Sequence, residues 1–285
     1  MVSDVKTVLV TGATGFVGHY VVDQLLTLDG VRVITTARTK PATPRLKTQF
    51  IPFDLRTDAS DVDLFTYFNK PDLVIHLAWQ GLPDYKSLAH INTYWLQHYR
   101  FLTNLLRNGL TNLTVTGTCL EYGLQSGCLS EALPTQPTTA YGLAKDTLRK
   151  ALDLFLTGQN VSFRWLRLFY MHGKGQNPRS LLAQVEAAAQ RNEMVFNMSK
   201  GEQLRDYLPI DTVANYIVQA ALQTTVTGVI NCCSGRPIAV RTLVEQFMEE
   251  HQYRLTLNLG YYPYPDYEPL AFWGNSQKLE TILTA

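Results

Sequence analysis

Cysteine is scarce in this sequence, which argues against a scaffold held together by disulfides. The 285-residue chain has four cysteines, of which Cys232 and Cys233 are adjacent and would make a poor structural bridge. No two of the four are spaced as a CxxC pair. The six histidines also lack the spacing of metal ligands. We therefore expect reduced thiols, as in a cytoplasmic protein, and no metal site.

An excess of charge is absent as well. The chain has 25 Lys and Arg against 24 Asp and Glu, so we expect neither nucleic acid nor an anionic membrane as a partner. No apolar run is long enough to cross a bilayer. A strand-like run begins at Thr7, which argues against a signal peptide. Repeats and low-complexity tracts are also lacking, so we expect a soluble, globular, cytoplasmic protein.

Strand-length apolar runs alternate with helix-length segments, the pattern of βαβ units around a parallel sheet. The predicted strands are residues 7–11, 31–36, 50–53, 73–78, 113–117 and 163–169. The predicted helices are residues 16–28, 89–108 and 141–156. The predicted fold class is therefore α/β, a Rossmann-type doubly wound parallel sheet. In such sheets ligands bind beyond the carboxyl ends of the strands.

After Phe169 the alternation loosens, and glycine and proline interrupt the chain as far as a Tyr/Pro-rich stretch at 261–265. This pattern predicts a smaller, irregular C-terminal lobe that binds the substrate. We expect the Rossmann domain to span residues 1–170, with 207–233 returning to it. The lobe would then consist of 171–206 and 234–285.

A glycine-rich turn follows the first predicted strand and opens the first helix. Glycine permits a tight turn and lets backbone N–H groups approach a pyrophosphate, which then meets the positive end of the helix. A glycine turn without a ligand is the alternative, but the flanking strand and helix favour a dinucleotide site. We predict that the cofactor contacts Gly12, Thr14, Gly15, Phe16, Val17 and Gly18.

The end of the second predicted strand bears on the choice between NAD and NADP. An NAD site usually has a carboxylate there, whereas this chain has Arg38 and Lys40. Arg38 can bind a 2′-phosphate bidentately, which favours NADP(H); both residues can instead be solvated surface groups. Asp54 can accept from the adenine amino group, with Leu55 as backbone partner, although such an Asp is more often a turn residue.

Tyr141 and Lys145 stand four residues apart, on one face of a predicted helix. A free tyrosine has a pKa of about 10, and a nearby ammonium group is expected to draw that pKa downward. Lys145 can also hold the nicotinamide ribose. Thr118 follows the fifth predicted strand and can hydrogen-bond a substrate carbonyl oxygen. These three residues supply the proton donor and the polarising group that carbonyl reduction requires.

Taken together, the motifs resemble those of extended short-chain dehydrogenases/reductases of the NAD-dependent epimerase/dehydratase family. They are TGATGFVG, HLAW at 76–79, Asn92, GTCLEYG at 117–123, YGLAK at 141–145, RLFYMHGKGQ at 167–176 and RDYLPIDTVA at 205–214. The resemblance covers nearly the whole chain and implies Thr118, Tyr141 and Lys145 as the catalytic triad, supported by Asn92.

The resemblance also implies the remaining contacts. Leu77, Ala78, Trp79 and Phe169 would line the cofactor, and Arg205 would face a nucleotide diphosphate. The expected substrate contacts are Trp79, Thr118, Cys119, Tyr170, His172, Gln176, Asn177, Arg179 and Arg205. A homodimer through the helices at 89–108 and 141–156 is implied as well.

Several positions depart from the family pattern. Dehydratases carry an Asp-Glu pair directly after the catalytic threonine, where this chain has Cys119 and Leu120. Glu121 comes one place later, and in an extended segment it would point to the other face, which argues against dehydration. Tyr170 stands where an Asn often touches the sugar nucleotide, and Trp79 replaces a small residue and would narrow the pocket beside the nicotinamide.

Other residues have a functional and a structural interpretation. The sequence favours His76 as a buried, hydrogen-bonded core residue rather than a catalyst, and Cys119 as a small buried hydrophobe rather than an acid. His172 can touch substrate. Gln176, Asn177 and Arg179 can contact sugar or phosphate, or Asn177-Pro178 can simply begin the next helix.

The function implied by the resemblance is NADPH-dependent reduction of the C4 ketone of a nucleotide-linked 4-keto-6-deoxyhexose. One alternative is a nucleotide-sugar 4-epimerase that retains NAD, although the carboxylate typical of such sites is missing after the second strand. A further alternative is a non-catalytic NADP-binding sensor. Such proteins often lose the Tyr or the Lys, and both are present here.

Overall fold

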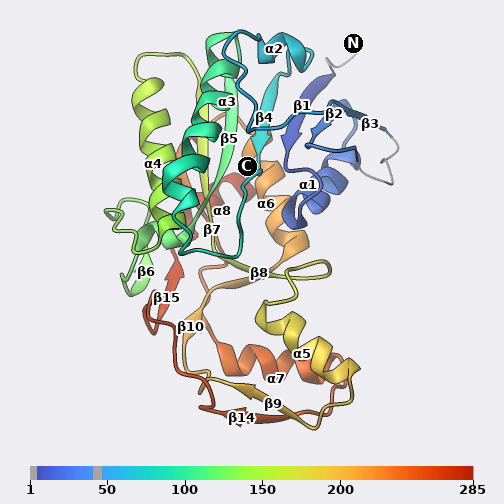
Figure 1. The fold of residues 1–285 in the computed structure, drawn as a ribbon, viewed down its shortest axis with the longest axis vertical. Coiled ribbons are helices and arrows are strands. Elements are labelled where there is room, and N and C mark those ends of the chain that lie inside the picture. Colours follow the sequence, from blue (N-terminus) through green and yellow to red (C-terminus); the bar gives the residue numbers. More distant parts are fainter. Residues whose placement is uncertain (1–4, 41–46, 285) are drawn as a thin grey trace.

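The computed structural model describes residues 5–40 and 47–284, and its centre is a seven-stranded parallel sheet (Figure 1). The spatial order β12-β7-β5-β4-β1-β2-β3 is that of a doubly wound sheet. The strands are β1 (Lys6–Thr11), β2 (Val31–Thr36), β3 (Thr48–Phe50), β4 (Leu73–His76), β5 (Asn112–Thr118), β7 (Ser162–Leu168) and β12 (Gly228–Cys232). The predicted fold class is therefore confirmed.

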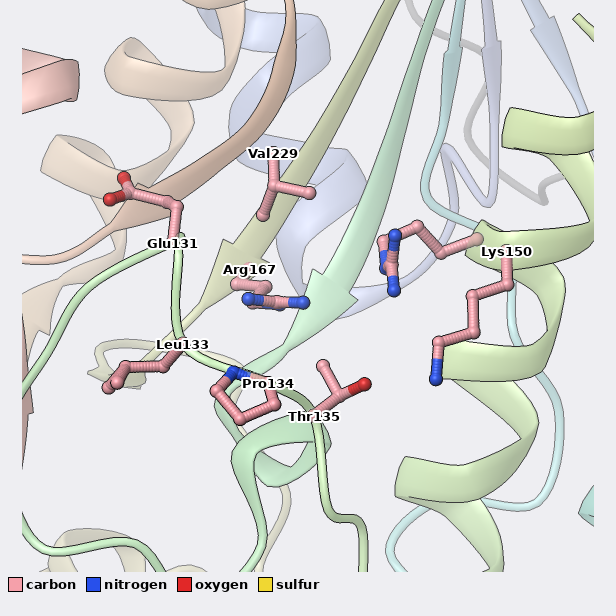
Figure 2. A pocket seen from close by; sticks show the side chains of 8 residues that line it. Glu131, Leu133, Pro134, Thr135, Lys150, Arg167 and Val229 are labelled. Carbon is pink, nitrogen blue, oxygen red and sulfur yellow. The ribbon is translucent and has the colours of Figure 1, made fainter. Parts of the chain in front are cut away.

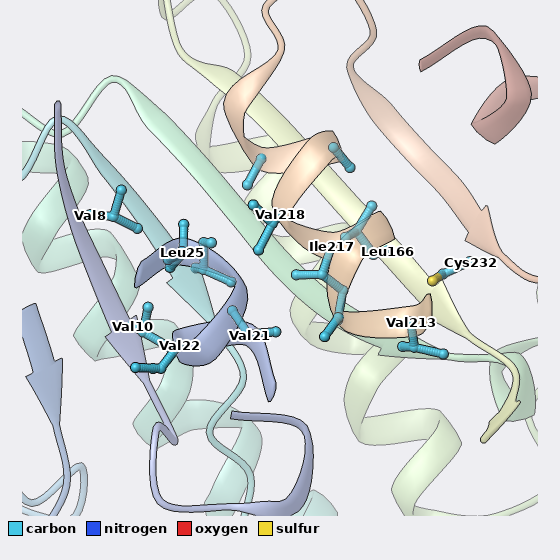
Figure 3. Close-up of a cluster of buried hydrophobic side chains, with 14 of the residues drawn as sticks. Val8, Val10, Val21, Val22, Leu25, Leu166, Val213, Ile217, Val218 and Cys232 are labelled. Carbon is cyan, nitrogen blue, oxygen red and sulfur yellow. The ribbon is translucent and has the colours of Figure 1, made fainter. Parts of the chain in front are cut away.

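Helices cover both faces of this sheet. On one face, α1 (Phe16–Leu26) packs against α6 (Ile210–Leu222) over a core of aliphatic side chains from β1, α1 and α6 (Figure 3). On the other face lie α2 (Leu64–Tyr67), α3 (Trp95–Arg107) and α4 (Ala140–Phe155), whose apolar side chains form a second core cluster. Because both faces are covered, β4 is buried along its whole length.

A smaller layer below the sheet contains α5 (Leu181–Gln190), β9 (Val195–Met198), α7 (Val240–Glu250) and β14 (Thr256–Leu259) (Figure 1). It has its own apolar cluster, which includes Val185, Met198 and Val244. Short strand pairs lie between the two parts of the chain. They are β8 (Tyr170–His172) with β11 (Tyr207–Pro209), β10 (Leu204–Arg205) with β13 (Ile238–Ala239), and β6 (Gly127–Leu129) with β15 (Phe272–Gly274).

The C-terminal helix differs from its expected place. We expected residues 234–285 in the small lobe, but α8 (Gln277–Leu283) packs against α6 and β12 of the sheet domain. Leu279 and Ile282 are three residues apart on one helical face, and both join the core cluster of α1 and α6.

Two other boundaries also shift. The strand predicted at 50–53 ends at Phe50, although Ile51 and Phe53 still donate backbone hydrogen bonds to Thr35 and Ala37. The helix predicted at 89–108 begins as a π-helical turn, η1 (His90–Tyr94), before α3 starts. Hydrophobic periodicity does not reveal such a turn, because a single widened turn is too short to show a period of its own. Among the described helices none is both long and apolar enough to span a membrane.

Candidate active site

The glycine-rich turn after β1 is sterically closed to larger residues. Gly12 has a φ of 67°, and a Cβ there would lie 2.7 Å from the backbone nitrogen of Ala78. A Cβ on Gly18 would lie 2.1 Å from the carbonyl oxygen of Gly12. Glycine therefore brings α1 and the Leu77–Ala78 backbone against the turn, as the sequence predicts for a dinucleotide site.

The N-terminus of α1 suits a pyrophosphate. Its N-cap, Gly15, offers no side chain to the first N–H groups, and no acidic residue lies in the first turn. At the end of β2, the buried hydroxyl of Thr36 has no partner among the described residues. A dinucleotide would meet both features. The chain therefore fits the cofactor that the sequence implies.

A second loop covers this turn. Tyr20 donates from its hydroxyl to the carbonyl oxygen of Lys174 at 2.8 Å, and Gly175 approaches the ring of Phe16. The loop after β8 therefore lies next to the start of α1. Within it, Gln176 donates its backbone N–H to Gly173.

At the expected adenosine end, Arg38 and Lys40 are exposed at the end of β2. Asp54 is held by Arg56, with 2.6 Å between Oδ2 and Nη2. This hydrogen bond, together with the positive charges of Arg56 and Arg38, lowers the pKa of Asp54. The Asp54 carboxylate, which was expected at the adenine amino group, is thus already paired with Arg56. Arg56 was missed in the sequence, although its place two residues after Asp54 is a usual spacing for a local ion pair.

Thr118 and Tyr141 meet at the carboxyl end of β5. Thr118 ends this strand and caps the 3-10 turn η2 (Cys119–Tyr122), while Tyr141 is the second residue of α4. Thr118 lies close enough to Tyr141 to lower the pKa of its phenol. Lys145, one turn further along α4, donates from Nζ to the carbonyl oxygen of Thr116 at 2.7 Å. The structure thus brings the three predicted triad residues together.

Tyr141 is 8% exposed and lies among aromatic rings. Its ring centroid is 5.6 Å from that of Tyr85, 5.4 Å from that of His90 and 5.9 Å from that of Trp79. Burial raises its pKa, and Tyr85, Glu121 and Cys119 raise it further, whereas Thr118 lowers it. The phenol is therefore neutral and suited to donate a proton.

The expected lowering of the Tyr141 pKa by Lys145 does not occur in this arrangement of the described residues. Burial lowers the pKa of Lys145 to about 7, against a smaller opposing effect of Glu121. Nζ also lies 4.1 Å from the ring centroid of Trp79. Lys145 therefore carries only part of a charge at neutral pH, and it is turned toward a carbonyl and a ring.

Behind Trp79 runs a chain of buried hydrogen bonds. His76 Nδ1 lies 2.9 Å from Thr11 Oγ1, His76 Nε2 lies 2.7 Å from His98 Nδ1, and His98 Nε2 lies 2.7 Å from Gln80 Oε1. Burial lowers the pKa of both histidines, that of His76 to about 3. Since Gln80 Oε1 can only accept, both rings are neutral and donate toward Gln80. His76 is thus a hydrogen-bonded core residue, as its sequence context predicts.

The support of the triad by Asn92 stays a prediction. Asn92 is exposed in η1, which packs against α4, and among the described residues no hydrogen bond joins its side chain to Thr118, Tyr141 or Lys145. His98 of α3 reaches toward the site, stacking on Trp79 with 4.4 Å between ring centroids. The signal for His98 was its helical spacing with the buried Phe101, Leu102 and Leu105.

Glu121 also differs from expectation. The segment after Thr118 is a helical turn rather than extended chain, so Glu121 folds back and accepts from the backbone N–H of Thr118 at 2.9 Å. Its other oxygen accepts from Arg167 Nε at 2.8 Å, in a fully buried ion pair. A carboxylate held in this way cannot transfer a proton to substrate, so dehydration is disfavoured for a different physical reason.

Arg205, expected at a nucleotide diphosphate, is buried and donates to Glu268 at 2.9 Å. Its guanidinium carbon lies 4.5 Å from the ring centroid of Phe272, and Tyr170 donates to the other oxygen of Glu268. The two expected substrate residues therefore share one carboxylate. A diphosphate would have to compete with Glu268 for Arg205.

The other expected contacts are dispersed. Cys119 and Phe169 lie in a small buried cluster with Phe272, and burial raises the pKa of the Cys119 thiol. His172 is half-buried in β8, and burial lowers its pKa. Asn177 accepts from the backbone of Arg179 and from Ser180. Asn177 thus forms a turn before α5, which begins only at Leu181, and its contact with sugar or phosphate stays a prediction.

A cavity of about 290 Å³ lies away from the triad (Figure 2). Its lining residues come from α4, β7, β12 and the chain before α4, and they are Glu131, Leu133, Pro134, Thr135, Arg149, Lys150, Arg167 and Val229. None of the triad residues contributes to it, so this cavity is not the site of the chemistry described above.

A dinucleotide-binding turn next to a Thr-Tyr-Lys triad defines the class of Rossmann-fold oxidoreductases that act on carbonyl and hydroxyl groups. The chain belongs to the NAD dependent epimerase/dehydratase family, whose model matches residues 8–233. Within residues 5–40 and 47–284, no group of three or more His, Cys, Asp or Glu side chains is placed to hold a metal ion.

Curated relatives of the chain are sugar-nucleotide enzymes by name. It is 30% identical over 278 residues to a dTDP-6-deoxy-L-talose 4-dehydrogenase (NAD(+)) from Aggregatibacter actinomycetemcomitans, covering 94% of this chain and 98% of that one. It is 28% identical to a dTDP-6-deoxy-L-talose 4-dehydrogenase (NAD(P)(+)) from Kitasatospora kifunensis, covering 85% of this chain and 78% of the other.

Solved structures share the fold. MoeE5 in complex with UDP-glucuronic acid and NAD superimposes with a TM-score of 0.81 at 24% identity, over 98% of this chain and 92% of that one. UDP-glucuronic acid 4-epimerase from Bacillus cereus does so with a TM-score of 0.82 at 23% identity, over 98% and 93% of the two chains.

Proposed function

We propose that the protein reduces, with NADPH, the C4 ketone of a nucleotide-linked 4-keto-6-deoxyhexose, with a dTDP sugar as first candidate. The observation that carries this proposal is the meeting of Thr118, Tyr141 and Lys145 at the end of β5, which only β4 separates from the strand that precedes the sterically closed glycine turn. The names of the two curated relatives, both 4-dehydrogenases of a dTDP-6-deoxyhexose, support the substrate class.

In the proposed reaction one residue donates a proton and another orients the substrate carbonyl. When bound, the nicotinamide cofactor supplies the hydride that reaches C4. Tyr141 donates its phenolic proton to the developing C4 alkoxide, because its raised pKa keeps it protonated until that stronger base forms. Thr118 donates a hydrogen bond to the same oxygen and fixes the carbonyl. Trp79 packs beside Tyr141 and helps to exclude water.

For the cofactor, we propose that Arg38 binds the 2′-phosphate of NADP(H). No carboxylate follows β2, and Asp54 is neutralised by Arg56, so a phosphate meets positive charge there. The two relatives carry NAD(+) and NAD(P)(+) in their names, so cofactor choice varies among similar chains.

The test follows cofactor oxidation by the purified protein with dTDP-4-keto-6-deoxyglucose, in parallel reactions with NADPH and NADH. We expect turnover that prefers NADPH and falls about 1,000-fold or more in Tyr141→Phe, since the proton donor is lost. Arg38→Ala should reduce the NADPH preference about 10-fold while leaving the NADH rate unchanged.

Three results would contradict the proposal. Equal rates in Tyr141→Phe would remove the catalytic role of the phenol. Tightly bound NAD in the purified protein, with interconversion of C4 epimers and no net cofactor use, would favour the 4-epimerase. Binding of NADPH without turnover of any nucleotide sugar would favour the non-catalytic sensor.

A further inference from the structure

Two segments from opposite parts of the chain meet over Tyr141. The first, residues 84–86, lies between β4 and η1, and the second, residues 266–268, lies between β14 and β15. Lys86 Nζ and Asp266 Oδ1 are 3.2 Å apart, and both side chains are well exposed. This ion pair therefore joins the two segments at the surface, above the catalytic tyrosine.

Beneath the ion pair, each segment contributes one tyrosine. The Tyr85 centroid is 5.6 Å from that of Tyr141 and 6.3 Å from that of Tyr267. The backbone N–H of Tyr141 donates to the carbonyl oxygen of Tyr85 at 3.0 Å, which ties the first segment to the start of α4. The rings of Tyr85 and Tyr267 therefore lie in a row beside Tyr141, where a sugar bound at the Tyr141 hydroxyl can contact them.

Burial surrounds the Tyr85 ring, and the cations near the two rings are paired with carboxylates or hydrogen-bonded to the backbone. Burial raises the pKa of Tyr85 to about 12, with smaller contributions from Tyr267, Cys119 and Glu268. Among the described residues near the rings, Arg205 is paired with Glu268, Lys86 with Asp266, and Lys145 donates to Thr116. A carboxylate placed here would lose hydration, and it would have to compete with Asp266 for Lys86, whose Nζ lies 5.7 Å from the Tyr267 ring centroid.

Resting on the proposed function, we propose that Tyr85 and Tyr267 contact the C5–C6 edge of the hexose and select its C6 substituent. Their ring faces favour a C6 methyl group over a hydroxymethyl group, and both over a carboxylate. An aromatic face gains from burying a methyl group, whereas a hydroxyl or carboxylate placed against it loses hydrogen bonds with water.

The test compares the binding of dTDP-6-deoxyglucose, dTDP-glucose and dTDP-glucuronate, which share one nucleotide and differ at C6. Isothermal titration in saturating NADPH gives dead-end complexes, because none of the three sugars is a ketone. We expect the dissociation constant to rise about 10-fold from methyl to hydroxymethyl and about 100-fold from methyl to carboxylate.

Substitutions of Tyr85 and Tyr267 distinguish the loss of a sugar contact from the loss of the folded structure. Tyr85→Ala and Tyr267→Ala should each weaken the binding of dTDP-6-deoxyglucose about 10-fold and bring the methyl and hydroxymethyl constants close together. Binding of dTDP alone should stay unchanged in both variants. Tyr85→Phe and Tyr267→Phe keep the ring faces and should retain the wild-type ratios. Tyr261→Ala, at an exposed tyrosine of the same C-terminal region, is the matched control.

Three outcomes would overturn the inference: wild-type constants that do not depend on C6, alanine variants with unchanged ratios, or equal weakening of dTDP itself. The ketoreductase assay distinguishes this failure from that of the proposed function. Turnover of the keto sugar without C6 discrimination removes only the inference. C6 discrimination without turnover removes only the proposed reaction.

Discussion

At the scale of single residues, burial moves the pKa values of Tyr141 and Lys145 in opposite directions, upward for the phenol and downward for the ammonium. Both shifts favour the neutral form, since a low-dielectric environment penalises charge. The site thus contains the protonated phenol of Tyr141 and the partly neutral amine of Lys145. That arrangement suits proton donation to a reduced carbonyl, and it costs stability because Lys145 is buried.

This cost predicts the pH dependence of stability. The folded pKa of Lys145 is about 7, against an ordinary value of 10.5. Between these values the unfolded chain binds more protons, so this group makes the free energy of unfolding rise with pH, by up to about 1.4 kcal/mol per unit. Below pH 7 its full penalty is present. We therefore expect Lys145→Met to be more stable than the wild type at pH 6, with a gap that narrows toward pH 10.

Urea denaturation of both proteins between pH 6 and pH 9 measures this gap. Lys86→Met removes a lysine that is 67% exposed, and its difference from the wild type should stay constant over the same range. A gap for Lys145→Met that is independent of pH would show that the ammonium is not desolvated. Activity should be lost in Lys145→Met at every pH.

At the scale of elements, the turn between β1 and α1 shows what sequence can predict. Gly12 and Gly18 are needed because backbone atoms approach them, and such local contacts follow from the spacing of the glycines. The helical spacing of His98 shows that it is buried, but its stacking on Trp79 did not follow from the sequence, because that contact joins α3 to the chain after β4. Glu121 was also misjudged, since its partner Arg167 lies 46 residues away.

The glycine requirement gives a direct test. In Gly18→Ala the new methyl carbon would lie 2.1 Å from the Gly12 oxygen, so α1 must move away from the turn. We expect NADPH binding, followed by fluorescence titration, to weaken about 100-fold or more, since the N–H groups of the helix start no longer meet the phosphates. Gln24→Ala lies on the same helix and should bind NADPH as the wild type does. Unchanged NADPH binding in Gly18→Ala would refute the pyrophosphate site at the start of α1.

At the scale of the whole molecule, the doubly wound parallel sheet followed from alternating patterns, because parallel strands are buried on both faces, whereas the strand order and β12 did not. The smaller part was harder to predict. Its strands have four or fewer residues, and α8 returns to the sheet domain from the end of the chain. Short strands carry little periodicity, so their pairing depends on contacts distant in sequence.

The resemblance to the family also implies a homodimer through α3 and α4, and the surface of α4 offers a way to test it. Leu143 and Leu154 are 44% and 78% exposed, and an 11-residue spacing is close to three helical turns, so they lie on one stripe. We propose that a second copy covers this stripe, since two exposed leucines in line are costly to hydrate.

Sedimentation velocity should then show the wild type at twice the mass of one chain. Leu154→Glu places a charge in the proposed interface and should shift the protein to single chains, with a dissociation constant raised about 100-fold or more. Met194→Glu, at a residue that is 75% exposed in the smaller part, is matched in exposure and should remain dimeric. A wild type that sediments as one chain would refute the dimer and leave the stripe as bare surface. A dimer that survives Leu154→Glu would place the interface elsewhere, because a glutamate buried between the two copies would lose its hydration.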